Sequence, residues 1–402
     1  MKILLLSLYY EPDIGPGALR NTSFARALSE QIDEDGKIDV ITTMPSRYGN
    51  YRRNVPEMEF DGKIRIRRIS VRPHSNSVFG QAFSYLSYAR AVIKQVHEKP
   101  YDLLYVSSSR LMTAVLGAII SRKYNIPLYL DLRDIFVETV RDVYAHNLLN
   151  FLSPVFIGLE KYAITSAKWI NLVSPGFESH FRSIAPEMTY RFFTNGFDDI
   201  GVMDKYSFHV KSRPMEIVYA GNIGEGQGLE HIIPRVARKL PRKWKLVIIG
   251  DGSRREVLKK ATAGLLNVYL HNPLSREDLM KRYSEASVLF LHLNNYRAFE
   301  KVIPSKIFEY AATGLPIIAG VKGVAASFIG EHVENAALFQ PCDADGFLEA
   351  LNKIRLQRIN RFDFKDRFSR KKISREMACD LLDDYLSYQN NLGHASMSGD
   401  TS

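Results

Sequence analysis

The recurrence of short apolar segments, each followed by a helical stretch, is the feature that most constrains the fold. A segment that is apolar at consecutive positions is typical of a strand buried on both faces of a parallel sheet. The pattern weakens between residues 185 and 214 and then restarts, which predicts an α/β chain with two doubly wound parallel sheets in series. The expected strands are residues 3–8, 38–43, 102–107, 127–132, 169–174 and 191–193, then 216–222, 244–251, 266–271, 287–292, 315–319 and 336–340.

Two domains also follow from the size of the chain, since 402 residues with 46% hydrophobic content can bury more than one core. The turn Thr194-Asn195-Gly196 lies in the stretch of low apolar density. We therefore predict a Rossmann-like first domain at residues 1–195 and a Rossmann-like second domain at 196–370. A C-terminal helix is expected at 371–390, and a disordered polar tail at 391–402.

The charge and cysteine content exclude several classes of protein. The formal charge of +10 favours an anionic partner, but the basic residues are scattered among acids and no nucleic-acid-binding motif is present, so we expect no nucleic acid. Two distant cysteines predict neither a disulfide framework nor a structural zinc site and fit a reducing cytoplasm. The start reads as a strand rather than a signal peptide, and the longest apolar runs fall short of the roughly 20 residues that span a bilayer.

Residues 302–320 predict a short helix followed by a strand. Pro304 and Ser305 start the helix, and Lys306, Glu309 and Thr313 share one polar face. Free N–H groups at a helix start bind phosphate, and a carboxylate one turn further could reach a ribose. An ordinary surface helix is the alternative, although a capping box would not explain the acid.

Two glycine-containing loops follow predicted strands and open helices. Neither loop has the dinucleotide-binding or Walker pattern, so each is either an anion site at the carboxyl edge of a sheet or a turn without a ligand. The candidate binding residues are Gly15, Gly17 and Arg20 in the first loop, Gly221, Asn222 and Gly224 in the second, and Gly250 after the next strand.

The run Pro-Ser-Lys-Ile-Phe-Glu-Tyr, with Gly-Leu-Pro-Ile-Ile-Ala after it, resembles the donor-nucleotide helix of the retaining glycosyltransferase family 4, which has the GT-B fold. The resemblance implies that Glu309 holds the ribose and that the free amides at the helix start, which Pro304 and Ser305 form, meet the diphosphate. It further implies that the first glycine loop and Arg20 face the cleft, that Leu274 lines the base pocket, and that the last helix crosses back to the first domain.

Two positions depart from the family pattern. Lys301 stands where the family often has a first acid, and Gln227 stands where a lysine commonly neutralises the diphosphate. Because a diphosphate leaving group needs positive charge, we assign that role to Lys301, Lys306 or Arg297 as a hypothesis.

Asp131-Leu-Arg-Asp134 ends a strand at the carboxyl edge of the first sheet. Asp131 and Asp134 are candidate catalytic residues that orient a sugar hydroxyl; the alternative is a surface ion pair. Together with the other motifs, this run looks most like the WbuB-type branch of family 4, the O-antigen fucosaminyltransferases.

Metal and membrane sites are less clearly marked. Asp343-Ala-Asp345 reads as a helix cap, and the histidines form no ligand pair, so we expect neither a metal nor another cofactor. The basic strand at residues 63–72 and the amphipathic helix at 79–96 are open to two interpretations, an ordinary strand and packed helix or a patch that meets anionic lipid.

These observations favour a cytoplasmic glycosyltransferase, with peripheral location at the inner face of the plasma membrane left open. The resemblance implies a donor such as UDP-linked N-acetyl-fucosamine, and a saccharide acceptor linked to polyprenyl diphosphate, in O-antigen or other surface polysaccharide biosynthesis. Two alternatives remain: a GT-B sugar-nucleotide epimerase, which needs no acceptor, and a non-catalytic nucleotide-sugar-binding scaffold protein.

Overall fold

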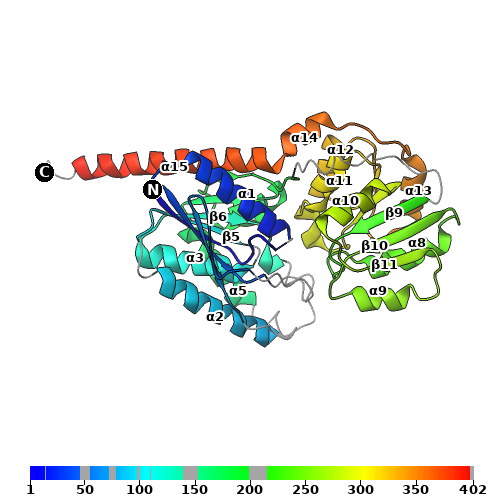
Figure 1. Ribbon diagram of the computed structural model, residues 1–402, viewed down its shortest axis with the longest axis horizontal. Helices are drawn as coiled ribbons and strands as arrows, with labels where there is room; N and C mark the ends of the chain where they lie inside the picture. Colours follow the sequence, from blue (N-terminus) through cyan, green and yellow to red (C-terminus); the bar gives the residue numbers. More distant parts are fainter. Residues whose placement is uncertain are drawn as a thin grey trace.

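The computed structural model describes residues 1–13, 15–45, 55–71, 78–96, 100–108, 110–138, 153–198 and 215–398, with the backbone alone at 78–84 and 392–398. Two α/β domains lie next to each other along the long axis, and each is built on one sheet (Figure 1). The predicted fold class, two doubly wound parallel sheets in series, is therefore confirmed.

The first sheet has eight strands in the order β3-β4-β2-β1-β5-β6-β7-β8, all parallel except for the antiparallel pair β3·β4. Crossover connections of this kind need helices on both faces. The strands are β1 Lys2–Leu6, β2 Lys37–Thr43, β3 Met58–Asp61, β4 Ile64–Ile69, β5 Leu103–Ser108, β6 Leu128–Leu132, β7 Trp169–Leu172 and β8 Tyr190–Arg191.

The second sheet has six parallel strands in the order β11-β10-β9-β12-β13-β14. The direction of crossover reverses beside β9, so the carboxyl ends of β9 and β12 flank the place where such sheets bind ligands. The strands are β9 Met215–Ala220, β10 Trp244–Ile249, β11 Val268–His271, β12 Val288–His292, β13 Ile317–Gly320 and β14 Ala336–Phe339.

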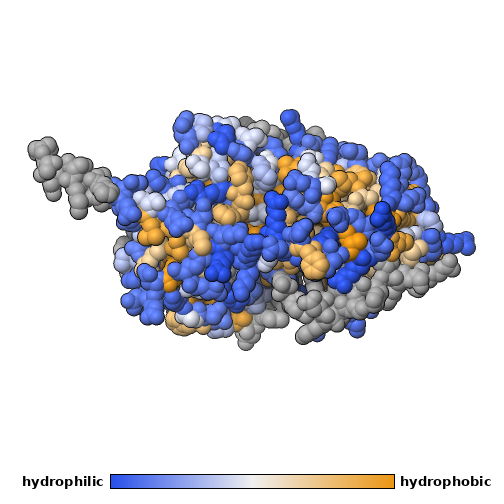
Figure 2. Space-filling view, turned by 90° about the horizontal axis from the view of Figure 1, so that it is seen from above, coloured by the Kyte–Doolittle hydropathy of each residue, from blue (hydrophilic) through white to orange (hydrophobic). Residues whose placement is uncertain are grey.

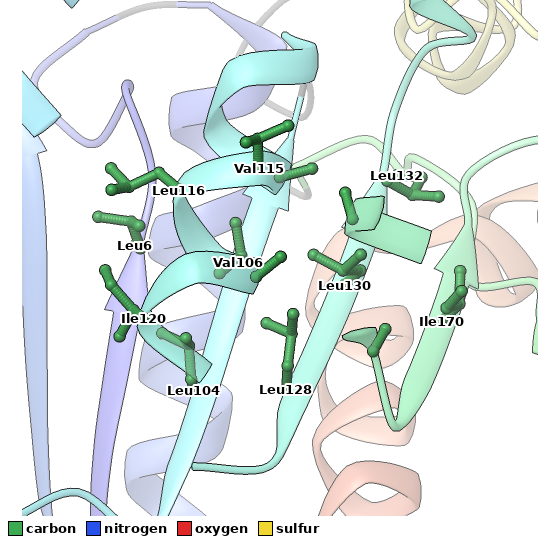
Figure 3. Packing of buried hydrophobic residues seen from close by; sticks show 14 of the residues in the cluster. Leu6, Leu104, Val106, Val115, Leu116, Ile120, Leu128, Leu130, Leu132 and Ile170 are labelled. Carbon is green, nitrogen blue, oxygen red and sulfur yellow. The ribbon is translucent and has the colours of Figure 1, made fainter. Parts of the chain in front are cut away.

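Alternate residues of the first sheet enter two different cores, which explains why its strands are apolar at consecutive positions. Leu4 and Leu6 belong to one core, whereas Ile3 and Leu5 belong to the other. The first core packs under α3, as Figure 3 shows for residues of β1, β5, β6, β7 and α3. The helices of this domain are α1 Pro16–Gln31, α2 Val78–Val96, α3 Leu111–Tyr124, α5 Ser153–Ser166, the 3-10 helix η2 Pro175–Phe177 and α6 Glu178–Ile184.

The helices of the second domain cover both faces of its sheet. Two connections join the domains, and they run side by side, because Phe197 N–H donates to the Phe368 carbonyl and Arg370 N–H donates to the Phe197 carbonyl. The helices that follow β9 are α8 Leu229–Lys239, α9 Arg255–Ala261, α10 Arg276–Ser284, the 3-10 helix η3 Arg297–Lys301, α11 Lys306–Thr313, α12 Val324–His332, α13 Ala344–Lys353 and α14 Phe362–Phe368.

The last helix, α15 Arg370–Ser398, leaves the second domain and lies along α1 on the first (Figure 1). Its Met377 and Leu381 are buried against Phe24 and Leu28 of α1. The backbone of α15 continues to Ser398, so residues 391–398, expected to be disordered, are helical, and 399–402 lie outside the described residues. Figure 2 views the face that carries α14 and α15, where hydrophobic residues lie in separate patches among hydrophilic ones.

Candidate active site

The glycine loops that follow β9 and β10 pack backbone against backbone at the carboxyl edge of the second sheet. Gly250 has a φ of +150°, and a Cβ there would lie 1.8 Å from the Gly221 carbonyl oxygen. Only glycine fits this close approach. The structure therefore brings Gly221 and Gly250 together, and their contact with a ligand stays a prediction.

Gln227 shapes the loop that contains Asn222 and Gly224. Its Oε1 accepts hydrogen bonds from Asn222 Nδ2 at 2.8 Å and from the Gly224 N–H at 3.2 Å. A lysine at this position could not accept either bond. The departure from the family pattern thus has a local structural role.

His292, which the sequence did not single out, holds the same loop from the end of β12. Its Nδ1 lies 2.6 Å from the Gln227 carbonyl oxygen, and its Nε2 accepts the Cys342 N–H at 2.9 Å. These partners require a neutral ring that carries its proton on Nδ1. Burial lowers the pKa of His292 to about 4, which keeps the ring neutral. The sequence feature that could have identified His292 is its position at the carboxyl end of a predicted buried strand.

The helix α11 is anchored beside β9 through Tyr310, whose hydroxyl lies 2.8 Å from the Ala220 nitrogen. On its polar face, Lys306 Nζ donates to both carboxylate oxygens of Glu309 at 3.1 and 3.0 Å. Burial would raise the pKa of Glu309, but attraction to Lys306 and Arg276 brings it below the ordinary value. The pair leaves 18% of the Glu309 side chain exposed, and its partners belong to the second domain.

The other predicted donor-side residues surround these loops. Pro304 and Ser305 directly precede α11, Leu274 packs against the core under α11, and Arg297 is exposed at the start of η3. Phe299 of η3 covers the glycine loop, since a Cβ at Gly226 would lie 3.0 Å from its ring. Their contacts with substrate stay predictions.

Arg20 and Asp131 have a different role from the one expected. Both are buried, with 3% and 0% exposure, and form a bidentate ion pair with two distances of 2.8 Å. Arg20 also donates to the carbonyl oxygens of Phe193 at 2.8 Å and Thr194 at 2.7 Å. Burial would raise the pKa of Asp131, but Arg20 lowers it below the ordinary value. We correct the prediction: the pair clamps the first domain to the connection between the domains and cannot touch a sugar without rearrangement.

The remaining first-domain candidates lie at the carboxyl edge of that sheet. Gly15 is buried at the start of α1, and Gly17 lies against Arg133, whose Nη1 would be 2.2 Å from a Cβ at Gly17. Asp134 is exposed. Asp134 therefore stays a catalytic candidate on accessibility, whereas Asp131 does not.

The two carboxyl edges meet at Lys301. Its Nζ donates to Oε1 of Glu138, in the segment after β6, at 2.6 Å, and its carbonyl accepts from the Ser174 hydroxyl at 2.5 Å. Glu138 was not predicted as a site residue, because no motif surrounds it. Lys301 thus joins the domains, and its role toward a diphosphate stays a prediction.

The proposed lipid-facing patch is altered by pairing within the first domain. Arg65 of β4 forms an ion pair with Asp39, Arg68 is paired with Glu59, and Tyr88 of α2 is buried. Residues 72–77 lie outside the described residues. Arg65 is therefore paired on the half-exposed face of β4, and Arg68 is buried on the opposite face, so contact of this strand with lipid stays a prediction.

Comparison with known proteins gives the class of the second domain. Residues 205–372 match the family model described as Glycosyl transferases group 1. Over these residues the chain is similar to group 1 glycosyltransferases. A putative colanic acid biosynthesis glycosyl transferase, WcaI of Escherichia coli (strain K12), is 32% identical over 100 residues, and the match spans 24% of this chain and 24% of that protein.

Solved structures share the two-domain GT-B fold of this chain. Anabaena Alr3699/HepE in complex with UDP-glucose has a TM-score of 0.63 at 17% identity, covering 95% of this chain and 99% of that one. The lipopolysaccharide outer core galactosyltransferase WaaB has a TM-score of 0.59 at 14% identity, covering 93% and 98%. The α,α-trehalose 6-phosphate synthase from Burkholderia multivorans has a TM-score of 0.67 at 13% identity, covering 97% and 99%. The finer resemblance to WbuB-type enzymes stays a prediction.

Two searches of the described residues bear on partners. No group of three or more His, Cys, Asp or Glu side chains suited to a metal ion occurs among them. In the same part of the chain, no helix combines the length and hydropathy needed to cross a bilayer. The expectation that neither metal nor cofactor takes part stays a prediction.

Proposed function

We propose that this protein transfers a sugar from a UDP-linked donor to a saccharide acceptor. The observation that carries the proposal is the convergence of the Gly221 and Gly250 loops, η3 and the start of α11 at one sheet edge, within the region that matches the group 1 family. This edge faces the first domain through Lys301. A donor bound there would lie next to an acceptor bound on the first domain.

The donor would be held mainly by the second domain. Backbone amides before α11 and in the Asn222 loop would receive the diphosphate, Glu309 the ribose hydroxyls, and Leu274 the base. Cations on η3 and α11 would stabilise the leaving diphosphate, which is the main charge that develops during transfer. The complex of HepE with UDP-glucose supports a UDP-linked donor.

For the reaction itself we propose retention of the anomeric configuration, with a donor phosphate oxygen taking the proton of the incoming hydroxyl. Catalysis would then depend on positioning and on charge stabilisation rather than on a protein nucleophile. Asp134, exposed at the facing edge, would orient the acceptor hydroxyl. Closure of the domains would exclude water from the reacting atoms.

We further propose a cytoplasmic enzyme with a lipid-linked acceptor, in O-antigen or another surface polysaccharide pathway, and N-acetyl-fucosamine as a candidate donor sugar. The names of WcaI, a putative colanic acid biosynthesis glycosyl transferase, and WaaB, a lipopolysaccharide outer core galactosyltransferase, support this setting. A polyprenyl diphosphate acceptor would bring the protein to an anionic membrane.

Membrane contact would use the helices α2, α3 and α5, which lie on the side of the first sheet away from α1 and α15 (Figure 1). Exposed cations on α2 accompany apolar side chains on this layer, a combination that suits anionic lipid. The apolar residues are Leu86 at 51%, Met112 at 37%, Ile119 at 40%, Val155 at 57% and Ile157 at 42% exposure, and the cations are Arg90 and Lys94.

A vesicle sedimentation assay tests this contact. Leu86→Glu should reduce binding to phosphatidylglycerol-containing vesicles. Leu266→Glu is the matched control, because Leu266 is 92% exposed but lies on the second domain. Equal vesicle binding by both variants, or no vesicle binding by the wild-type protein, would count against membrane contact through these helices.

Mass spectrometry of a polyprenyl diphosphate acetamido-sugar acceptor, incubated with a panel of UDP-sugars, tests the transferase proposal. A mass gain of one sugar residue that depends on donor is the expected result. An altered sugar nucleotide formed without acceptor would indicate an epimerase. Nucleotide binding with no change in either substrate would indicate a scaffold protein.

A further inference from the structure

Four charged side chains form a continuous chain from the interior of the first domain to the second. Glu160 of α5 lies 2.8 Å from Nε2 of His180 on α6, and Nδ1 of the same ring lies 3.1 Å from Oε1 of Glu138. That oxygen also accepts from Lys301 Nζ at 2.6 Å. We call these four residues the charge chain. Their signs alternate from one residue to the next when His180 is protonated.

The inner end of the charge chain is fixed by burial. The Glu160 side chain is 5% exposed and the His180 side chain 14%, compared with 24% for Glu138 and 27% for Lys301. Because a carboxylate faces each ring nitrogen, both nitrogens can donate only when the ring is an imidazolium. Burial opposes this charge, but the hydrogen bonds to Glu138 and Glu160 outweigh it and raise the pKa of His180 to about 9.

The outer end is fixed by main-chain contacts. The buried Ser174 hydroxyl donates to the Lys301 carbonyl at 2.5 Å. A Cβ at Gly176 would lie 2.5 Å from the same carbonyl oxygen and 2.8 Å from Val324 of α12. The first domain therefore holds Lys301 by both its main chain and its side chain, at the end of the 3-10 helix that covers the glycine loop.

We propose that His180 and Glu138 are positioning residues for transfer, which set the Lys301 ammonium group at the junction of the two carboxyl edges. This rests on the proposed function only where it concerns turnover; the effect on domain arrangement is independent of it. His180 does not touch substrate in this scheme. His180 holds the Glu138 carboxylate in place, and that carboxylate holds Lys301. These contacts set the position of the two domains relative to each other.

A double-mutant cycle tests whether His180 acts through Lys301. His180→Gln and Lys301→Met should each lower kcat about 10- to 100-fold. The kcat of the double variant should be no more than about twofold below that of the slower single variant, because the effects of residues in one network are not additive. Effects that multiply, or a His180→Gln enzyme with normal kcat, would overturn the proposal. His231→Gln is the matched control, since His231 lies on α8 of the second domain and is not one of the four residues of the charge chain.

The distance between the domains gives a readout that needs no turnover. Spin labels at exposed positions 87 on α2 and 259 on α9, with Cys342 and Cys379 replaced by alanine, should give one narrow distance in the wild-type protein. His180→Gln and Lys301→Met should broaden or shift it, and His231→Gln should not. If neither the wild-type protein nor any variant turns over a donor, the proposed function fails, but the distance measurement still tests the positioning role. An unchanged distance in both variants refutes that role.

Discussion

Replacing Asp131 by asparagine tests the reassigned role of the buried ion pair. The substitution preserves the size of the side chain but removes its charge, so the Arg20 guanidinium stays buried without a counter-charge. Both residues are almost completely buried, and the pair is bidentate at 2.8 Å. Breaking such a pair from one side costs about 3–5 kcal/mol. We expect the free energy of unfolding of the first domain to fall by that amount.

Tryptophan fluorescence during urea unfolding can isolate this domain. The protein has two tryptophans, Trp169 in β7 of the first domain and Trp244 in β10 of the second, and both are buried. In a Trp244→Phe background, the signal therefore reports on the first domain alone. The Asp131→Asn variant should unfold at a markedly lower urea concentration than this background protein.

Two controls separate the charge effect from a general one. The double variant Arg20→Met/Asp131→Leu removes both charges and should lose less stability than Asp131→Asn, because it leaves no buried charge unpaired. Asp345→Asn removes one partner of the exposed pair with Lys239 and should leave the unfolding curve unchanged. An Asp131→Asn protein within about 1 kcal/mol of its background, but without transferase activity, would refute the structural role and restore a catalytic one.

Three further predictions concern the second domain. The pKa of His292 is about 4 in the folded protein and 6.5 ordinarily, so between these pH values only the unfolded chain takes up a proton. The free energy of unfolding should therefore fall by up to about 3 kcal/mol as the pH drops from 6.5 to 4. Urea unfolding of His292→Asn should lack this part of the pH dependence. Gly250→Ala should weaken UDP binding in calorimetry, because its Cβ would displace the Gly221 carbonyl, and unchanged affinity would argue against the paired loops as the site. Lys306→Ala should lower kcat at least about tenfold in the transfer assay through loss of positive charge at α11, whereas normal kinetics would leave Lys306 only its ion pair with Glu309.

The sheet strands could be predicted because burial on both faces leaves a signal in every residue. Each run of apolar residues supplies both cores of its domain at once. The strand β3 was missed for the same physical reason: Met58 and Phe60 are 51% and 68% exposed on the antiparallel edge strand, so no buried pattern marks it. The helical extension to Ser398 was missed because small polar residues carry no signal that separates a helix from a disordered tail.

The glycine loops could be predicted for a different reason. A close backbone approach such as that of Gly250 to Gly221 requires glycine, and the requirement is visible in the sequence. The partner of a charged residue is not visible in this way. Asp131 lies beside Arg133 in sequence, but its bidentate partner is Arg20, which is 111 positions away. Sequence spacing therefore identified the sheet edge and misassigned the role of the acid.

The same limit applies to the two departures from the family pattern. Gln227 accepts two hydrogen bonds inside the loop, and Lys301 is bound by Glu138 from the other domain. A site that had lost its function would have no reason to keep a loop folded by the substituted residue, or a half-buried histidine that holds the acid beside the substituted lysine. We therefore expect the positive charge that the diphosphate needs to act from η3 rather than from the glycine loop, with a cation whose position depends on the first domain. On this argument a cation bound in this way contributes only when the domains are together, which favours a transferase that acts in the closed arrangement over a passive nucleotide-binding scaffold.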